Sequence, residues 1–250
     1  FAAPLAFDPF NYNLGTMPVS PNSPWTTFNT GTTSSVVAGL AAPPGFAPAT
    51  GNAFGGTGTI DYQRPFASQN TGAVFFSFLL NVPNVPGSSF NIAGLSNGSS
   101  AFHGRVFVQA GPVSSYQIGV SANQAAGTYG ATPPSFSLGQ SVLVVGSYQF
   151  VAGTANNVAS LWINPSSTSF GAALPPTPDI SVVSSSDTSA LSNFYIRPDS
   201  AVPGVIIDEV RVGTTWADVT PAPIPEPAAV ALLGLAVASG GLLVRRRAVR

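Results

Sequence analysis

The chain has 250 residues, enough for one large β domain and a tail, and its 26 glycines and 24 prolines favour turns and strands over long helices. Charged residues are 7% of the chain, lysine is absent and the net charge is -1, which argues against a nucleic-acid partner because phosphate binding needs clustered basic side chains. Cysteine is also absent, which excludes disulfides, thiolate metal sites and cysteine nucleophiles.

The first residues have the composition of a processed leader. Residues 1–6, FAAPLA, look like the end of a secretory signal, with Ala3 or Ala6 as the cleavage position and a mature start near Phe7. An ordinary N-terminal tail is the alternative. Residues 7–53 are rich in Gly, Pro, Ser, Thr and Asn, and predict a loop-heavy entry with one short strand at 34–40.

Turn-forming clusters recur at regular intervals after residue 53. Apolar or alternating runs are separated by turn clusters such as NVPGSS and SNGSS, and no segment between them indicates a crossover helix. This pattern predicts an all-β protein, an antiparallel β-sandwich of the jelly-roll type, over residues 7–219. The expected strands are 73–82, 89–95, 105–111, 116–122, 141–150, 157–165, 180–184, 193–198 and 204–213.

The last expected strand contains a carboxylate among apolar residues. Strict alternation places Asp208 on the same face as Val210 and Val212. A buried carboxylate needs hydrogen-bond donors, so Asp208 is expected to fix a loop rather than to catalyse or to hold a metal.

The C-terminal segment predicts an anchor. Residues 220–227, TPAPIPEP, form an extended proline-rich linker, and the uncharged residues 228–244 predict a single transmembrane helix at the short end for a membrane span. The final segment, 245–250, is expected to stop in the cytoplasm and to leave residues 1–220 outside. Its arginines are Arg245, Arg246, Arg247 and Arg250.

Three residues of this tail carry a family resemblance. Pro225, Glu226 and Pro227, followed by an apolar span and terminal arginines, resemble the PEP-CTERM sorting signal of exported proteins in biofilm-forming bacteria. The resemblance implies a cell-envelope or extracellular protein, anchored transiently in the membrane and recognised by the sorting protease exosortase. The segments FDPFNYNLGT, LWINP and IDEVRVGTTWADV also resemble exported PEP-CTERM proteins whose laminin-G or concanavalin A-like jelly roll has two packed antiparallel sheets.

The sequence offers little for catalysis. A glycoside hydrolase needs two carboxylates facing each other across a cleft, but the chain has two glutamates, Glu209 and Glu226, and alternation directs Asp208 and Glu209 to opposite faces. No catalytic residue is identified, and the sequence predicts a protein that is not an enzyme.

Metal binding rests on a few loop aspartates. One histidine and no cysteine argue against an ordinary zinc site, and no cofactor is expected to be required. Laminin-G-like domains sometimes bind calcium, and Asp179, Asp187 and Asp199 lie in loops where oxygen ligands could converge. Solvated or turn-capping aspartates are the alternative.

Two functions remain open from sequence. Low charge weakens repulsion between copies and favours a structural, self-assembling component of an extracellular layer, filament or biofilm. The alternative is a lectin-like module that binds secreted polysaccharide through aromatic platforms and amides. The candidate platforms are Trp25, Trp216, Tyr116 and Tyr129, although tryptophans on strands often fill a core instead.

Overall fold

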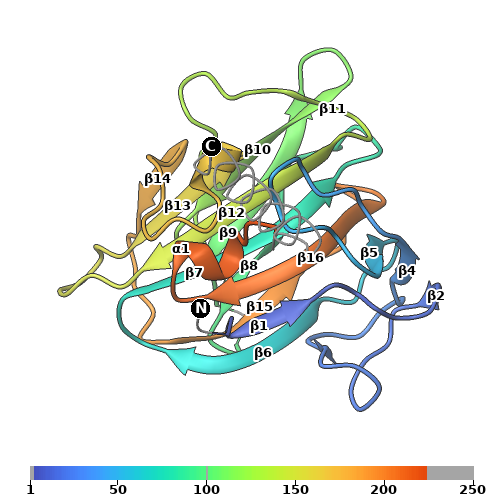
Figure 1. The fold of residues 1–250 in the computed structure, drawn as a ribbon, viewed down its shortest axis with the longest axis horizontal. Helices are drawn as coiled ribbons and strands as arrows, with labels where there is room; N and C mark the ends of the chain where they lie inside the picture. Colours follow the sequence, from blue (N-terminus) through green and yellow to red (C-terminus); the bar gives the residue numbers. More distant parts are fainter. Residues whose placement is uncertain (1–2, 100, 224–250) are drawn as a thin grey trace, which may run out of the picture.

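The computed structural model describes residues 3–99 and 101–223. These residues form two packed antiparallel sheets, which confirms the predicted all-β sandwich (Figure 1). Sheet A has the order β14-β13-β12-β7-β16-β5-β4-β2, with β1 paired to β16, and sheet B has the order β11-β10-β9-β8-β15-β6-β3.

Sheet A is formed by β1 (Ala6–Asp8), β2 (Gly15–Thr16), β4 (Ser35–Ala38), β5 (Asn52–Gly56), β7 (Ala73–Asn81), β12 (Ser141–Gln149), β13 (Val158–Ile163), β14 (Ile180–Val183) and β16 (Val205–Gly213). Sheet B is formed by β3 (Thr26–Thr27), β6 (Tyr62–Gln69), β8 (Phe90–Ser96), β9 (Phe102–Gly111), β10 (Ser115–Ser121), β11 (Phe136–Ser137) and β15 (Leu191–Ile196). A short helix, α1 (Trp216–Val219), and a 3₁₀ turn, η1 (Ser167–Ser169), complete the described elements.

The main core lies between the sheets. Because side chains alternate along a strand, each sheet directs one apolar face inward. Phe76 and Phe78 of β7 meet Phe194 of β15, with ring centroids 5.7 and 5.9 Å apart. These contacts join the two layers at their centre.

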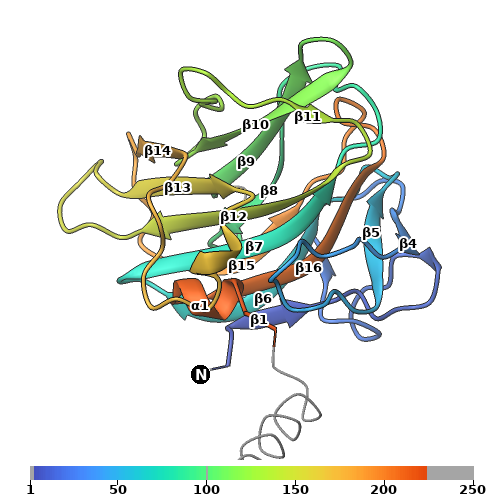
Figure 2. The same cartoon turned by 45° about the horizontal axis from the view of Figure 1, so that its top comes forward.

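A second apolar cluster covers the outer face of sheet A. Leu79 and Val145 lie beneath Trp216 of α1 and Trp162 of β13, whose ring centroids are 5.1 Å apart. Figure 2 shows α1 lying against this side of the sandwich. The end of the described chain lies here too, because the Ala47 N–H donates to the Pro221 carbonyl at 2.9 Å.

The N-terminal segment contacts the sandwich. Strand β1 begins at Ala6, which is buried, and Leu5 packs against the core. Leu5 and Ala6 therefore contact the folded body, and the signal remnant over residues 1–6 stays a prediction.

Strand β16 departs from the expected alternation. Glu209 has a φ of 51°, and the pairing with β7 shifts register between Asp208 and Arg211. This bulge brings Ile207 and Val210 into the core together, so Asp208 does not share a face with Val210 as strict alternation had implied. Asp208 nevertheless fixes a loop as expected, because its Oδ2 accepts from the Leu40 N–H at 2.8 Å.

The tail predictions lie outside the described residues. They concern Pro225, Glu226, Pro227, the span 228–244, Arg245, Arg246, Arg247 and Arg250. Within residues 3–99 and 101–223, no helix has the length and apolar character needed to cross a membrane.

Candidate functional site

Three of the four predicted sugar platforms belong to the core. Trp25 is 0% exposed, stacks on Phe10 with a centroid separation of 5.5 Å, and donates its indole N–H to Asp8 at 2.8 Å. Trp216 is 1% exposed and Tyr116 is 0% exposed. A side chain without exposed surface offers no face to a sugar, so the structure corrects the expectation for these three residues.

Tyr129 is the predicted platform that remains at the surface. It is half-buried, and its hydroxyl lies 2.5 Å from Ser89 Oγ. The ring lies over β10 at Gly119, where an added Cβ would come within 2.7 Å of the ring. Burial raises the pKa of the Tyr129 phenol, which keeps it protonated at neutral pH.

The three candidate calcium ligands each bind backbone in a separate loop. Asp179 accepts from the Ile163 N–H at 2.7 Å, Asp187 from the Asn157 N–H at 3.1 Å, and Asp199 from the Ala201 N–H at 2.8 Å. Across residues 3–99 and 101–223, no group of three or more His, Cys, Asp or Glu side chains could hold a metal ion. Calcium binding stays a prediction.

Polar side chains gather on the outer face of sheet B. In β9 the core takes Val106 and Val108, so alternation turns Arg105 and Phe107 to the other face. In β15 Tyr195 lies outside for the same reason. We call this group the sheet-B site, and it comprises Asp61, Asn91, Arg105, Tyr129, Tyr195 and Arg197.

Asn91 is the centre of the hydrogen-bond network in this site. Its Oδ1 accepts from Arg105 Nη2 at 2.8 Å and from Arg197 Nη1 at 3.1 Å. Its Nδ2 donates to the Tyr195 hydroxyl oxygen at 3.1 Å. The amide thus holds two guanidinium groups and a phenol in fixed positions.

Arg197 is the partly exposed member of the network, with 26% of its side chain accessible. Its Nε lies 3.1 Å from Asp61 Oδ2, and its guanidinium carbon lies 5.0 and 5.2 Å from the ring centroids of Phe90 and Phe102. An ion pair and two aromatic contacts therefore fix its orientation.

The loop of residues 122–128 covers the other arginine. Arg105 Nη1 donates to the carbonyls of Asn123 and Ala125 at 3.1 and 3.0 Å, and its guanidinium lies 4.7 Å from the Phe107 ring centroid. Its Nε is buried and has no hydrogen-bond partner within residues 3–99 and 101–223. Burial lowers the pKa of Arg105, and the charge of Arg197 acts in the same direction.

Burial raises the pKa values of the acidic and phenolic members of the site. Burial raises the pKa of Asp61, and the neighbouring Arg197 opposes the rise. Tyr195 is 0% exposed, and burial raises the pKa of its phenol far enough to keep it neutral at neutral pH. The site therefore carries at most one negative charge against two positive ones.

A row of amides extends the site across sheet B. Gln109 of β9 donates through Nε2 to Gln117 Oε1 of β10 at 2.9 Å, and both side chains are half-buried. Amides beside aromatic rings and a guanidinium are the groups that sugar hydroxyls bind in proteins.

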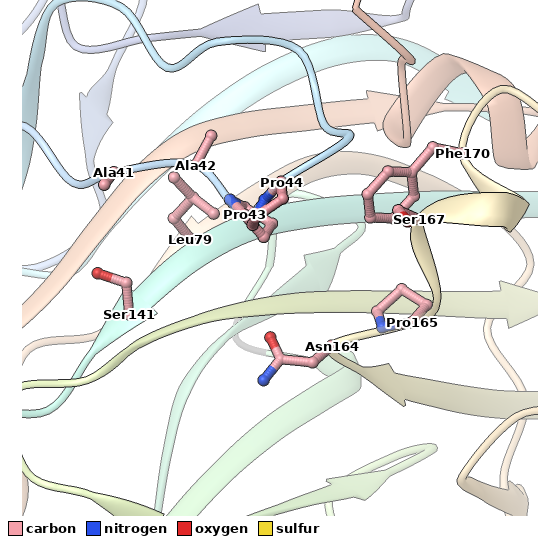
Figure 3. Close-up of a pocket in the computed structure, with 10 residues that line it drawn as sticks. All are labelled: Ala41, Ala42, Pro43, Pro44, Leu79, Ser141, Asn164, Pro165, Ser167 and Phe170. Atoms are coloured by element: carbon pink, nitrogen blue, oxygen red, sulfur yellow. The ribbon is translucent and has the colours of Figure 1, made fainter.

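The main alternative is a cavity of about 420 Å³ on the outer face of sheet A, shown in Figure 3. It is lined by Leu79, Phe170 and prolines such as Pro43, with polar groups from Ser141 and Asn164. Asn164 Oδ1 is already used, because it accepts from the Leu143 N–H at 2.9 Å. No lining side chain is titratable, so the cavity offers no acid, base or charge.

The candidate site residues predicted from the sequence did not include Asn91, Arg105, Tyr195 or Arg197. A usable signal was present, since arginine is rare in this chain and Arg105 alternates with core valines in β9. The convergence of the four residues required knowledge of which strands are neighbours.

The sequence matches no family model and no curated protein. The fold is similar to that of a variant of alginate lyase Aly36B in complex with an alginate trisaccharide, with a TM-score of 0.52 and 10% identity over 84% of this chain and 98% of that chain. It is also similar to the globular domain of T. cruzi calreticulin (TM-score 0.45, 13% identity, 81% and 88% covered). A further match is a glycosyl hydrolase family protein from Mycobacterium fortuitum (TM-score 0.41, 10% identity, 84% and 100% covered).

The likeness to the lyase overturns the prediction that this protein is not an enzyme. The same sandwich, over 98% of the lyase chain, is the scaffold of an enzyme, so the fold is compatible with catalysis. At 10% identity the likeness concerns the fold and assigns no catalytic residue. What this chain shares with the lyase is the antiparallel β-sandwich architecture.

Proposed function

We propose that this protein is an exported carbohydrate-binding protein that holds polysaccharide on the outer face of sheet B. The observation that carries the proposal is the sheet-B site itself. It combines a half-buried aromatic ring, Tyr129, with a fixed guanidinium, Arg197, and it continues into the amides Gln109 and Gln117. The fold that presents this face is shared with a protein whose bound ligand is an alginate trisaccharide.

The sheet edges bear on self-assembly by strand addition. A polymer built by strand addition needs a long unpaired edge. The terminal strands of sheet A are β14 with four residues and β2 with two, and those of sheet B are β11 and β3 with two residues each. Such short edges support few intermolecular backbone hydrogen bonds, but β3 covers only Tyr62 and Gln63 of β6, so residues 64–69 leave a longer edge at which a second copy could pair. The edges therefore do not decide between binding and self-assembly.

The position of the chain end supports an orientation. Thr220 and Pro221 bond to Gly171 and Ala47 on the outer face of sheet A. If the following segment anchors the protein in a membrane, sheet A lies toward that membrane and the sheet-B site lies away from it. An extracellular polysaccharide would then reach the site without competition from the lipid surface.

Glycan binding is tested with the full chain. We expect saturable binding to at least one extracellular polysaccharide in affinity electrophoresis, with and without calcium, and a loss of about tenfold in Tyr129→Ala, since one stacked ring contributes ~1–2 kcal/mol. Leu174→Ala is the matched control, because Leu174 is an exposed apolar residue in another loop. Equal binding by both variants, or no binding to any glycan, would overturn the proposal.

Cleavage of the bound polysaccharide is the second candidate function. The observation that favours it is the fold, which is shared with an alginate lyase over 98% of the lyase chain. Prolonged incubation with the glycan, followed by size-exclusion chromatography, tests this function. Shortened products would establish cleavage, and an unchanged polymer would leave binding alone.

The sorting signal also becomes a proposal. We infer that exosortase recognises Pro225, Glu226 and Pro227, that residues 228–244 hold the precursor in the membrane, and that Arg245 to Arg250 remain cytoplasmic. Cell fractionation of a Glu226→Ala variant in a host with exosortase tests this. We expect the variant to accumulate in the membrane fraction while the native chain reaches the surface or medium, and identical distributions would refute the inference.

A further inference from the structure

We propose that the sheet-B site binds the carboxylate of an acidic sugar, so that the polysaccharide it takes is a polyuronate. The inference rests on the proposed carbohydrate-binding function and adds the ligand class. It is carried by the charge of the site, by the fixed position of Arg197 and by the length of the polar row beside it.

The charge of the site is unusual for this chain. Four of the eight basic residues lie in the described body, and two of them, Arg105 and Arg197, donate to the same Asn91 oxygen. Asp61 pairs with Arg197, whereas Arg105 bonds to backbone carbonyls and an amide and has no carboxylate partner among the described residues. Arg105 is buried and Arg197 is half-buried, so their guanidinium groups repel each other in surroundings of low polarity, and an anionic ligand would relieve that repulsion.

Arg197 has an unused donor. Nε is occupied by Asp61 and Nη1 by Asn91, while Nη2 donates to no group in the described part of the chain and is not buried. The ion pair, the amide and the rings of Phe90 and Phe102 hold the guanidinium in place before any ligand arrives. A charge-assisted bond from such a pre-positioned donor costs little side-chain entropy.

The surroundings indicate a sugar polymer rather than a small free anion. The polar row runs from Arg197, at the end of β15, past Asn91 on β8 to Gln109 on β9 and Gln117 on β10. Four neighbouring strands extend over roughly 14 Å, at the usual interstrand spacing. Tyr129 stands beside this row, so a chain of sugar rings would find aromatic and amide contacts next to the cation.

The test compares two polymers on the full chain by titration calorimetry. The probes are polyguluronate and the same polymer after reduction of its carboxyl groups to neutral hydroxymethyl groups. We expect the neutral polymer to bind at least ~10-fold more weakly, and Arg197→Gln to lose ~10-fold for polyguluronate with little change for the neutral polymer, as expected for one charge-assisted hydrogen bond. Arg64→Gln, which removes an arginine of β6 outside the site, is the matched control and should leave both affinities unchanged.

The outcomes separate this inference from the function on which it rests. Equal affinity for the two polymers would overturn the acidic ligand and leave carbohydrate binding intact, and binding to neither would remove both. If Arg197→Gln fails to fold, the salt dependence of the wild-type protein decides, because an exposed guanidinium–carboxylate contact weakens as salt rises. Polyguluronate affinity that is independent of salt would refute the carboxylate contact.

Discussion

At the scale of single residues, Asp208 couples folding to pH. It is fully buried, its two oxygens accept from the N–H groups of Leu40 and Glu209, and burial raises its pKa from 3.8 to about 7, with the charges of Glu209 and Asp8 adding to the rise. A pKa raised by folding means that the folded state binds the proton more tightly. The stabilisation is therefore complete below about pH 4 and is lost as the pH rises to about 7.

The variant Asp208→Asn removes this titration. We expect it to be less stable than the wild type at about pH 4, because the amide nitrogen cannot accept a hydrogen bond, and the deficit to shrink by on the order of 2 kcal/mol by about pH 8. Urea unfolding at several pH values measures the difference, with Asp179→Asn at an exposed carboxyl as the control. A deficit that stays constant with pH would contradict the assignment.

Gly119 controls the position of Tyr129. A Cβ at this position would lie 2.7 Å from both the Thr128 carbonyl oxygen and the Tyr129 ring, and the Val120–Thr128 backbone pair lies directly beside it. We expect Gly119→Ala to destabilise the fold by about 1–3 kcal/mol and to weaken glycan binding several-fold, because the ring must move. Thermal unfolding and glycan titration measure both effects. Gly87→Ala, where an added Cβ meets only the Ala201 carbonyl oxygen at an ordinary contact distance of 3.9 Å, should change neither.

At the scale of elements, helix α1 acts as a cover for sheet A. Thr215 and Asp218 form a capping box at its start, and Trp216 packs its indole against Trp162 and Phe75. We expect Trp216→Ala to cost about 3–5 kcal/mol of unfolding free energy, as a large core truncation does. The glycan affinity of the folded fraction should stay at the wild-type value, since α1 lies on the sheet opposite the site. Lower affinity in the folded fraction would indicate that Trp216 contributes to sugar binding.

The strands that the sequence predicted and the strands that it missed differ in their residue pattern. The central strands β7 and β12 are long apolar runs, and period-two pattern locates them directly. The sequence did not predict strand β6, because the strand contains Pro65. Proline is tolerated there because β3 pairs only with Tyr62 and Gln63 and leaves the rest of β6 at an edge of the sheet. The sequence did not predict strand β5, because the strand ends in two glycines. One of them, Gly55, leaves the space that the Val37 side chain occupies.

At the scale of the whole molecule, the two outer faces of the sandwich differ in chemical character. Sheet A is covered by apolar side chains and receives the end of the described chain, while sheet B carries the polar network. Composition had indicated that aromatic and amide residues were available, but the partners of the site are far apart in sequence, as with Arg197 and Asp61 at a separation of 136 residues. Only the strand order brings them together, so the fold could be predicted from sequence and the site could not.

This division predicts a footprint for the ligand. Backbone hydrogen exchange of the full chain, with and without a bound polysaccharide, should slow in the loop 122–130 and around Arg197, because the sugar chain shields these amides. Residues 41–44 and 164–170, which line the cavity on sheet A, should exchange at the same rate in both states. Protection confined to the sheet-A segments would place the glycan in that cavity instead. It would also reverse the proposed orientation, because the binding face would then lie beside the segment that leads to the C-terminus.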